Sequence, residues 1–217
     1  SLADALYLAV PADAAGVRVA GDWDPLGMRA TASRSLELDD VFVPERARLL
    51  PEGLYAQAAQ RFPHMNFTLA STYFGIAQAA YDFSVQYLRA ELPGMVPVKR
   101  RMYPTKQVAV AQMRIRLEQT RALFVQTLRE ARIDPDDDAR QRLYAAHYSV
   151  MENAQAISAL ALRTCGGQAM LKSLPLERLY RDARCGALML PWTAELCLDR
   201  LGHECLYARA EHDEAIG

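Results

Sequence analysis

The residues best suited to chemistry in this 217-residue chain are a basic cluster between residues 99 and 132. Only Glu118 and Glu130 oppose these cations, which leaves a formal excess of seven positive charges. An arginine fork can bind two phosphate oxygens at once, and the amides at a helix N-terminus also attract anions. The cluster therefore fits a phosphate site, but a solvated face with arginines at a subunit contact would have the same composition. Its members are Lys99, Arg100, Arg101, Lys106, Arg114, Arg116, Arg121, Arg129 and Arg132.

A second feature is the pair Gly166-Gly167, which follows a long helical pattern. Two glycines allow a sharp turn and let another group approach the backbone closely. A plain helix C-cap would use a glycine at the same place. The sequence alone leaves both interpretations open.

Other reactive side chains form none of the familiar motifs. The chain has no GxGxxG, Walker or G-x-S-x-G pattern, so no Rossmann, P-loop or hydrolase site is indicated. The histidines and cysteines show neither HExxH nor CxxC spacing, and we expect no metal site and no disulfide framework. These residues are His64, His147, His203, His212, Cys165, Cys185, Cys197 and Cys205.

Composition narrows the class of protein. The formal net charge is −1, which argues against a nucleic-acid partner. No apolar run approaches the roughly 18 to 20 residues that a membrane helix needs. With no recognisable signal peptide and no cysteine framework, we expect a reduced, cytoplasmic protein that does not engage a membrane.

The elements that must position these residues change in character along the chain. Residues 6–10 form a short apolar run, and residues 17–19 and 35–43 alternate apolar and polar side chains. Bounded by Pro and Gly, these segments predict three or four strands of a β layer. So small a sheet is marginal alone, and we expect part of it to lie outside the sequence. From about residue 60, apolar side chains recur every three or four residues.

Three long helices are predicted, with apolar stripes over 67–88, 113–128 and 143–164. Pro93-Gly94, Asp134-Pro135 and Gly166-Gly167 would end them. A short segment after Pro175 and a final helix near 192–209 follow. We therefore expect a mainly α protein: an antiparallel four-helix bundle over residues 53–217, preceded by a partial antiparallel β domain over residues 1–52.

Three sequence blocks resemble the acyl-CoA dehydrogenase superfamily, in the family's order. The stretch GDWDPLGMRATASRSLELDDVFVPE (21–45) resembles the second half of its middle β domain. The stretch ASTYFGIAQAAYD (70–82) is similar to the first long helix of its C-terminal bundle. The stretch LRTCGGQAMLKSLPLERLYRDAR (162–184) resembles the block Q-x-x-GG-x-G followed by P-x-E-R-x-x-RDA. The chain thus resembles about the C-terminal half of a complete family member.

The resemblance implies FAD as cofactor in a homotetramer built as a dimer of dimers, in which each FAD also reaches the neighbouring subunit. Gly166 and Gly167 would lie against the adenosine diphosphate of the neighbour's FAD. Arg100 or Arg101 would bind the pyrophosphate, with Gln107 contacting FAD nearby. Thr193 would touch FAD after the catalytic loop. An acyl-CoA or related thioester would be the substrate in fatty acid metabolism, and an electron-transfer flavoprotein a further partner.

The residues depart from the family at its catalytic base, a glutamate that takes the α-proton as hydride leaves the β-carbon. The two places where the family carries it hold Leu190 and Met65. Glu195 and His64 are the nearest candidates in sequence. Arg163 and Ala169 also replace the usual glutamine and last glycine of the GG block.

The resemblance therefore implies a flavoprotein oxidoreductase that dehydrogenates an acyl thioester across Cα–Cβ, present here as a fragment expected to be inactive alone. Two alternatives accommodate the missing glutamate. One is a flavin-dependent oxidase or monooxygenase of the same fold, which needs no α-proton base. The other is a catalytically inactive assembly subunit.

Overall fold

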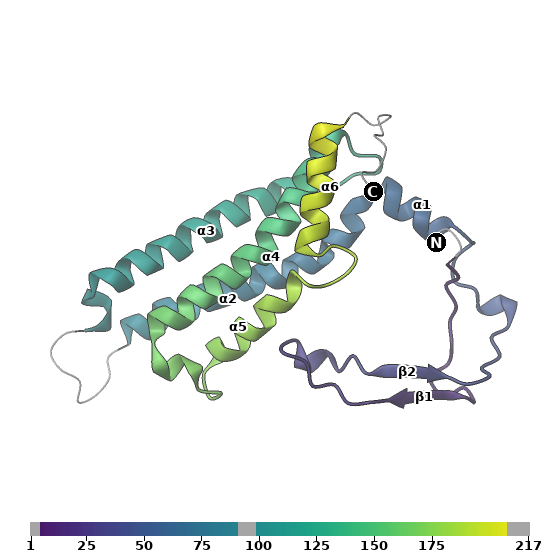
Figure 1. Ribbon diagram of the computed structural model, residues 1–217, viewed down its shortest axis with the longest axis horizontal. Helices are drawn as coiled ribbons and strands as arrows, with labels where there is room; N and C mark the ends of the chain where they lie inside the picture. The colour runs from purple at the N-terminus through teal and green to yellow at the C-terminus, as the bar shows by residue number, and fades with distance from the viewer. Residues whose placement is uncertain (1–4, 91–98, 208–217) are drawn as a thin grey trace, which may run out of the picture.

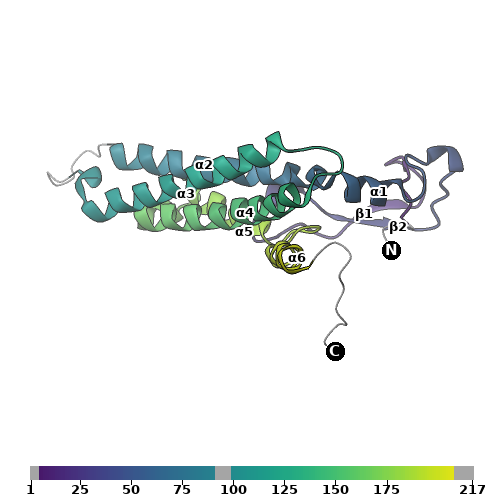
Figure 2. The same ribbon diagram turned by 90° about the horizontal axis from the view of Figure 1, so that it is seen from above.

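The computed structural model describes residues 5–90 and 99–207. Three long helices dominate it: α2 (Thr68–Arg89), α3 (Pro104–Arg129) and α4 (Asp137–Cys165). They run antiparallel in sequence order, with the shorter α5 (Pro175–Gly186) alongside them and α6 (Ala194–Leu206) across one end (Figures 1 and 2). A short helix, α1 (Leu54–Arg61), leads into the bundle. The expected antiparallel helical bundle is confirmed.

Helix α4 is the centre of the core, since it packs against α2, α3, α5 and α6. Its buried stripe includes Leu143, Val150, Ala154, Ile157 and Ala161, which follows the predicted spacing. The small alanines let neighbouring helices approach closely. The helix begins where Asp136 accepts a hydrogen bond from the Ala139 amide at 2.9 Å, and it ends at Gly166.

Helix ends otherwise fall near the predicted positions. The helix expected to end at Pro93-Gly94 has its last described turn at Arg89, and Pro93-Gly94 lies outside the described residues. Asp134, in the left-handed region with φ 52°, lies between α3 and α4 as expected.

The β region is smaller than predicted. It consists of β1 (Val17–Ala20) and β2 (Ser35–Leu38), an antiparallel pair in which Val17 faces Leu38 and Ala20 faces Ser35. The strand predicted over 6–10 is wrong: Leu8 forms only an isolated bridge with Arg48. The strand predicted over 35–43 is too long, because Asp40 takes φ 49° just after β2. Within the described residues these segments have no further neighbour to pair with, so their alternating pattern does not become a ladder.

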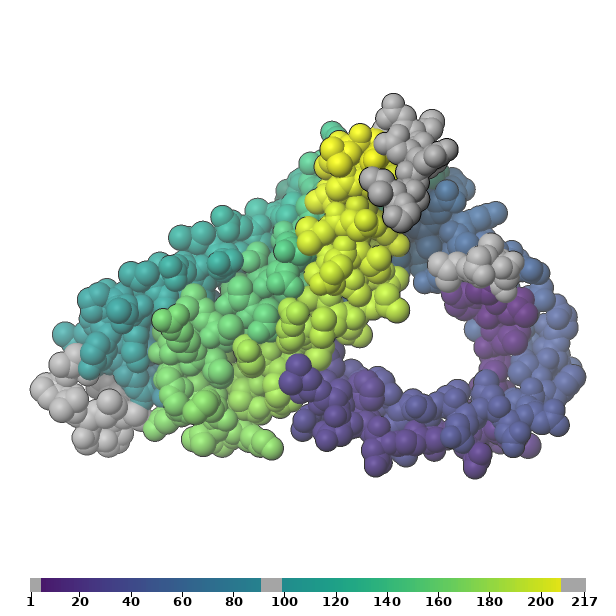
Figure 3. Space-filling model, viewed as in Figure 1, coloured from purple at the N-terminus to yellow at the C-terminus, as the bar shows by residue number. Residues whose placement is uncertain are grey.

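The hairpin lies apart from most of the bundle and returns to it only at its tip. Figure 3 shows a wide opening bounded by the hairpin segment on one side and by α6 and the end of α5 on the other. No helix among the described residues is both long and apolar enough to cross a membrane.

Candidate functional site

The predicted site residues lie at two opposite ends of helix α4. Arg100, Arg101, Gln107, Gly166 and Gly167 lie around its C-terminal end, which we call the glycine end. Leu190, Thr193 and Glu195 lie near its N-terminal half, at what we call the loop end. From Tyr144 to Gly166 the helix spans 22 residues, or roughly 30 Å.

At the glycine end, Arg100 is held within the chain. Its side chain is buried, its guanidinium lies 4.0 Å from the centre of the Tyr87 ring, and its Nη1 donates to the Tyr87 carbonyl at 3.1 Å. The Tyr87 hydroxyl in turn donates to Gln168 Oε1 at 3.0 Å. Arg100 therefore ties the start of α3 to the end of α2, and Tyr87 connects both to the segment after the double glycine.

Arg101 and Gln107 also take part in local contacts. Arg101 Nη1 donates to the Arg89 carbonyl at 3.1 Å, and Gln107 Nε2 donates to the Arg101 carbonyl at 3.0 Å. Both side chains are exposed. Arg100, Arg101 and Gln107 therefore lie at the same end of α4 as the double glycine, and their contact with a flavin stays a prediction.

The double glycine leaves open space beside its backbone. Gly166 takes φ 85°, a conformation that favours glycine, and it ends α4 as the C-cap. A Cβ added at Gly166 or Gly167 would meet nothing within 4 Å in the described residues. The C-cap interpretation is therefore correct, and the room for a close approach by another group is also present.

Next to this space, a groove of about 350 Å³ separates the start of α3 from the end of α4. Lys106 and Arg163 are its only charged lining residues, and both are cations. Sequence reasoning treated Arg163 only as a departure from the family pattern. The N-terminal amides of α3 add to the positive potential here, so the groove fits an anionic group such as phosphate.

At the loop end, residues 187–193 join α5 to α6. Trp192 is buried, and its ring lies edge-on to Tyr144 at 5.3 Å and to His147 at 5.2 Å between centroids. The buried Tyr73 hydroxyl donates to Met189 Sδ at 3.3 Å, and burial raises the pKa of Tyr73 to about 12. These aromatic contacts fix the loop on the bundle.

Thr193, expected to touch flavin, is the N-cap of α6, and its hydroxyl accepts from the Leu196 amide at 3.2 Å. Leu190 is 75% exposed and precedes the cis-bonded Pro191. Glu195 is exposed in the first turn of α6, where a carboxylate complements the helix dipole. The loop thus presents a hydrocarbon side chain at the place where the resemblance puts a carboxylate.

Met65, at the second place where the resemblance puts a base, lies in the short 3-10 segment η4 (Pro63–Phe67) before α2. His64 beside it is buried, and neither of its ring nitrogens has a hydrogen-bond partner among the described residues. Burial, with help from the Arg132 charge, lowers the pKa of His64. His64 is therefore a neutral side chain packed inside the protein.

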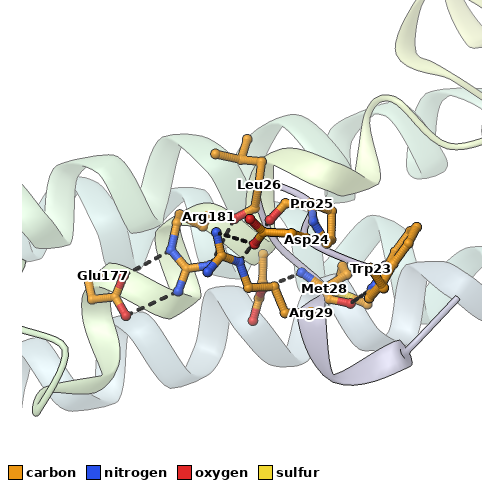
Figure 4. A network of polar contacts seen from close by, with 9 residues as sticks. Trp23, Asp24, Pro25, Leu26, Met28, Arg29, Glu177 and Arg181 are labelled. Carbon is orange, nitrogen blue, oxygen red and sulfur yellow. Dashed lines mark hydrogen bonds and ion pairs between the residues drawn. The ribbon is translucent and has the colours of Figure 1, made fainter. Parts of the chain in front are cut away.

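Two of the resembling sequence blocks, more than 150 residues apart, contact each other (Figure 4). Arg181 Nη1 donates to the Leu26 carbonyl at 2.8 Å, and Asp182 Oδ1 accepts from the Met28 amide at 2.6 Å. Glu177 holds the same arginine, with Arg181 Nε donating to its Oε2 at 2.9 Å. The tip of the hairpin is therefore fixed to α5 by the arginine and aspartate of RDA.

Comparison with known proteins agrees with this architecture. The family model described as acyl-CoA dehydrogenase, C-terminal domain, matches residues 52–190. The chain therefore belongs to the acyl-CoA dehydrogenase family.

Its relatives differ in the reactions that their names describe. The bovine mitochondrial short-chain specific acyl-CoA dehydrogenase is 32% identical, covering 81% of this chain and 42% of the relative. L-Evernosamine nitrososynthase of Micromonospora is 31% identical, covering 96% and 52%. The structure of KijD3 with FMN and dTDP-3-amino-2,3,6-trideoxy-4-keto-3-methyl-D-glucose has a TM-score of 0.71 and 27% identity, covering 95% and 52%. The chain spans about half the length of these relatives.

Proposed function

We propose that the protein to which this chain belongs is a flavin-dependent monooxygenase. The observation that carries the proposal is that the two positions where the resemblance places the base hold Leu190 and Met65. Neither side chain can accept a proton, whereas oxygen insertion needs no base for an α-proton. The nitrososynthase also matches nearly the whole chain, and a nitroso group carries an oxygen atom on nitrogen.

The residues of the glycine end fit a flavin phosphate. Lys106, Arg101 and Gln107 offer donors, and the backbone of Gly167 is open to close approach. Reduced flavin would supply two electrons, so that one atom of O₂ enters the substrate and the other leaves as water. We propose a flavin cofactor on this basis. FAD, as the resemblance implies, and FMN, as in the KijD3 complex, both carry the required phosphate.

In this proposal the residues of this chain bind the flavin and shield the reacting group from water, and none of them transfers a proton. Trp192 and Tyr144 hold loop 187–193 against α4, and the Leu190 hydrocarbon faces outward from the loop. An apolar loop beside the reacting group would limit access of water. We also propose that the glycine end serves the flavin of a second copy of the chain, which makes the enzyme an oligomer.

The test uses the complete protein with chemically reduced FMN or FAD in air. A monooxygenase gives oxygen consumption coupled to substrate oxidation, and under anaerobic conditions butyryl-CoA leaves its oxidised flavin yellow. Flavin bleaching by acyl-CoA with no coupled oxygen insertion would contradict the proposal. Retention of neither flavin would favour the assembly-subunit alternative.

Acyl-CoA dehydrogenation is the second candidate, favoured by the 32% identity to the bovine short-chain enzyme. It requires a carboxylate from elsewhere, and Glu195 is the nearest in sequence to Leu190. If Glu195 is the base, Glu195→Gln abolishes anaerobic bleaching by acyl-CoA, whereas Glu118→Gln on the exposed face of α3 leaves it intact. Equal bleaching by both variants would exclude Glu195 as the base.

A further inference from the structure

We propose that Asp182 of α5 is a positioning residue, which holds the strained hairpin tip on α5 and thereby sets the position of the loop end. The tip is the segment 21–34 that joins β1 to β2. The family resemblance includes this aspartate in RDA but implies no role for it. The link of Asp182 to catalysis rests on the proposed function, whereas its coupling of the tip to the loop end does not.

Asp182 and Arg181 both bind the backbone of the tip. Asp182 Oδ1 accepts from the Met28 amide at 2.6 Å, and Arg181 Nη1 donates to the Leu26 carbonyl at 2.8 Å. Glu177 fixes the arginine by accepting from its Nε at 2.9 Å and from its Nη2 at 3.1 Å. Because the partners in the tip are backbone groups, both contacts require the chain of the tip to follow one path.

The backbone of the tip is strained at the residue that Asp182 binds. Met28 has φ 55° and ψ 32°, and Ala32 has φ 47°, in the left-handed region that is costly for residues with a Cβ. The Met28 carbonyl accepts from the Trp23 indole at 3.3 Å and from the Thr31 hydroxyl at 2.9 Å. Strained backbone persists where several contacts fix it together. Loss of the Asp182 contact is therefore expected to let the tip relax.

Asp182 also lies one helical turn before the end of α5, where the loop end begins. Gly186 follows it by about 6 Å along the helix axis, and a Cβ there would lie 2.7 Å from the Tyr73 ring. The Tyr73 hydroxyl donates to Met189 Sδ in the loop at 3.3 Å. Burial raises the pKa of Tyr73 to about 12, and the nearby groups of Cys185 and Asp182 act in the same direction. A displacement of α5 at Asp182 would therefore change the contact that anchors the loop end.

The tip is where the hairpin returns to the bundle, across from the wide opening beside α6 (Figure 3). The contact at Asp182 thus fixes the β region relative to the loop that carries Leu190. In the proposed function a fixed loop end shields the reacting group from water. A displaced loop is then expected to lower coupled substrate oxidation without loss of the flavin, which the glycine end binds.

The test uses fluorine NMR of the complete protein labelled with 5-fluorotryptophan. Trp23 reports on the tip and Trp192 on the loop end, and Trp23→Phe and Trp192→Phe assign their signals. We expect Asp182→Ala to change the chemical shifts of both. Asp182→Asn removes the charge but keeps an oxygen that accepts from the Met28 amide, so both signals should stay at the parent positions. Asp82→Ala, at an exposed aspartate of α2, should change neither.

Gly27→Ala displaces the tip from the hairpin side and keeps the proposal falsifiable if Asp182→Ala does not fold. It should change both tryptophan signals as well. A change at Trp23 with no change at Trp192 would overturn the inference, because the loop end would then be independent of the tip. Unchanged signals in both Asp182→Ala and Gly27→Ala would overturn it too.

The link to catalysis is measured separately, as coupled oxygen consumption with reduced FMN. Asp182→Ala should lower the turnover number by about tenfold or more with flavin retention unchanged, and Asp182→Asn should restore it. Parent turnover in Asp182→Ala would contradict the positioning role. An inactive parent protein that still shows the coupled tryptophan signals contradicts the proposed function alone.

Discussion

Single aromatic residues decide the shape of the loop end. Trp192 is 3% exposed, whereas Trp23 is 37% exposed in the hairpin tip. We expect Trp192→Ala to lower the free energy of unfolding by about 3 to 5 kcal/mol, because it leaves a cavity between Tyr144 and His147. Trp23→Ala is the matched control and should cost much less. Chemical denaturation measures both, and equal losses would show that the loop is not anchored through Trp192.

His147 makes the stability depend on pH. Burial lowers its pKa from 6.5 to about 4, against a smaller opposing influence of the Trp192 backbone. Between these values the unfolded chain binds a proton that the folded chain does not. Stability is therefore present in full above about pH 6.5 and is lost as the pH falls toward 4, by up to about 3 kcal/mol.

His147→Gln removes this titration while leaving His64 in place. The free energy of unfolding of the variant should fall less steeply between pH 6.5 and 4 than that of the parent protein. Identical slopes in urea denaturation at several pH values would contradict a neutral, buried His147.

The roles of individual site residues were the least predictable part of the site. Its residue type predicts that Arg100 binds a phosphate. In the structure its guanidinium stacks on the ring of Tyr87, which precedes it by 13 residues. The hydroxyl of Thr193 caps α6, a role that the sequence analysis did not assign, and its contact with flavin stays a prediction. Such roles depend on which neighbours the fold supplies, and residue type and spacing do not contain that information.

At the scale of elements, the helices were predictable because their packing follows a local period. The stripe from Leu143 to Thr164 became the buried face of α4. The strands were predicted less well, because a strand needs a partner that is distant in sequence. Leu8 shows this most clearly, since its only bridge is to Arg48.

The contact between the hairpin tip and α5 depends on a glycine. A Cβ at Gly27 would lie 2.4 Å from the Arg181 carbonyl oxygen and 2.8 Å from the Asp182 amide nitrogen. Both are backbone atoms of α5, which cannot move aside as a flexible side chain can. Gly27→Ala should therefore move the tip away from α5 and destabilise the protein by about 1 to 3 kcal/mol, as overpacking does.

The control for this prediction is Gly75→Ala in the exposed part of α2. A Cβ there meets nothing within 4 Å, and alanine favours a helix over glycine by up to about 1 kcal/mol. Thermal unfolding should thus shift in opposite directions for the two variants. A rise in melting temperature for Gly27→Ala would contradict the close contact.

At the scale of the whole molecule, the two ends of α4 cannot serve one bound dinucleotide, because roughly 30 Å separates them. If the glycine end binds the flavin of a second copy, each active site combines the loop end of one subunit with the glycine end of its partner. Closed two-fold assemblies repeat such a contact symmetrically. A substitution at the loop end of a chain then disables one active site of the dimer. A substitution at the glycine end of the same chain disables the other active site.

Mixing two defective chains tests this arrangement. Gly167→Asp places a carboxylate in the open space of the glycine end, and Leu190→Asp alters the exposed loop. Each variant alone should be inactive. Co-expression with two different tags and purification through both gives mixed dimers in which one site carries both defects and the other none. These dimers should recover about half of the parent activity in the oxygen-consumption assay. Inactive mixed dimers would mean that both ends of a chain serve the same active site. That result would exclude an active site built from two subunits.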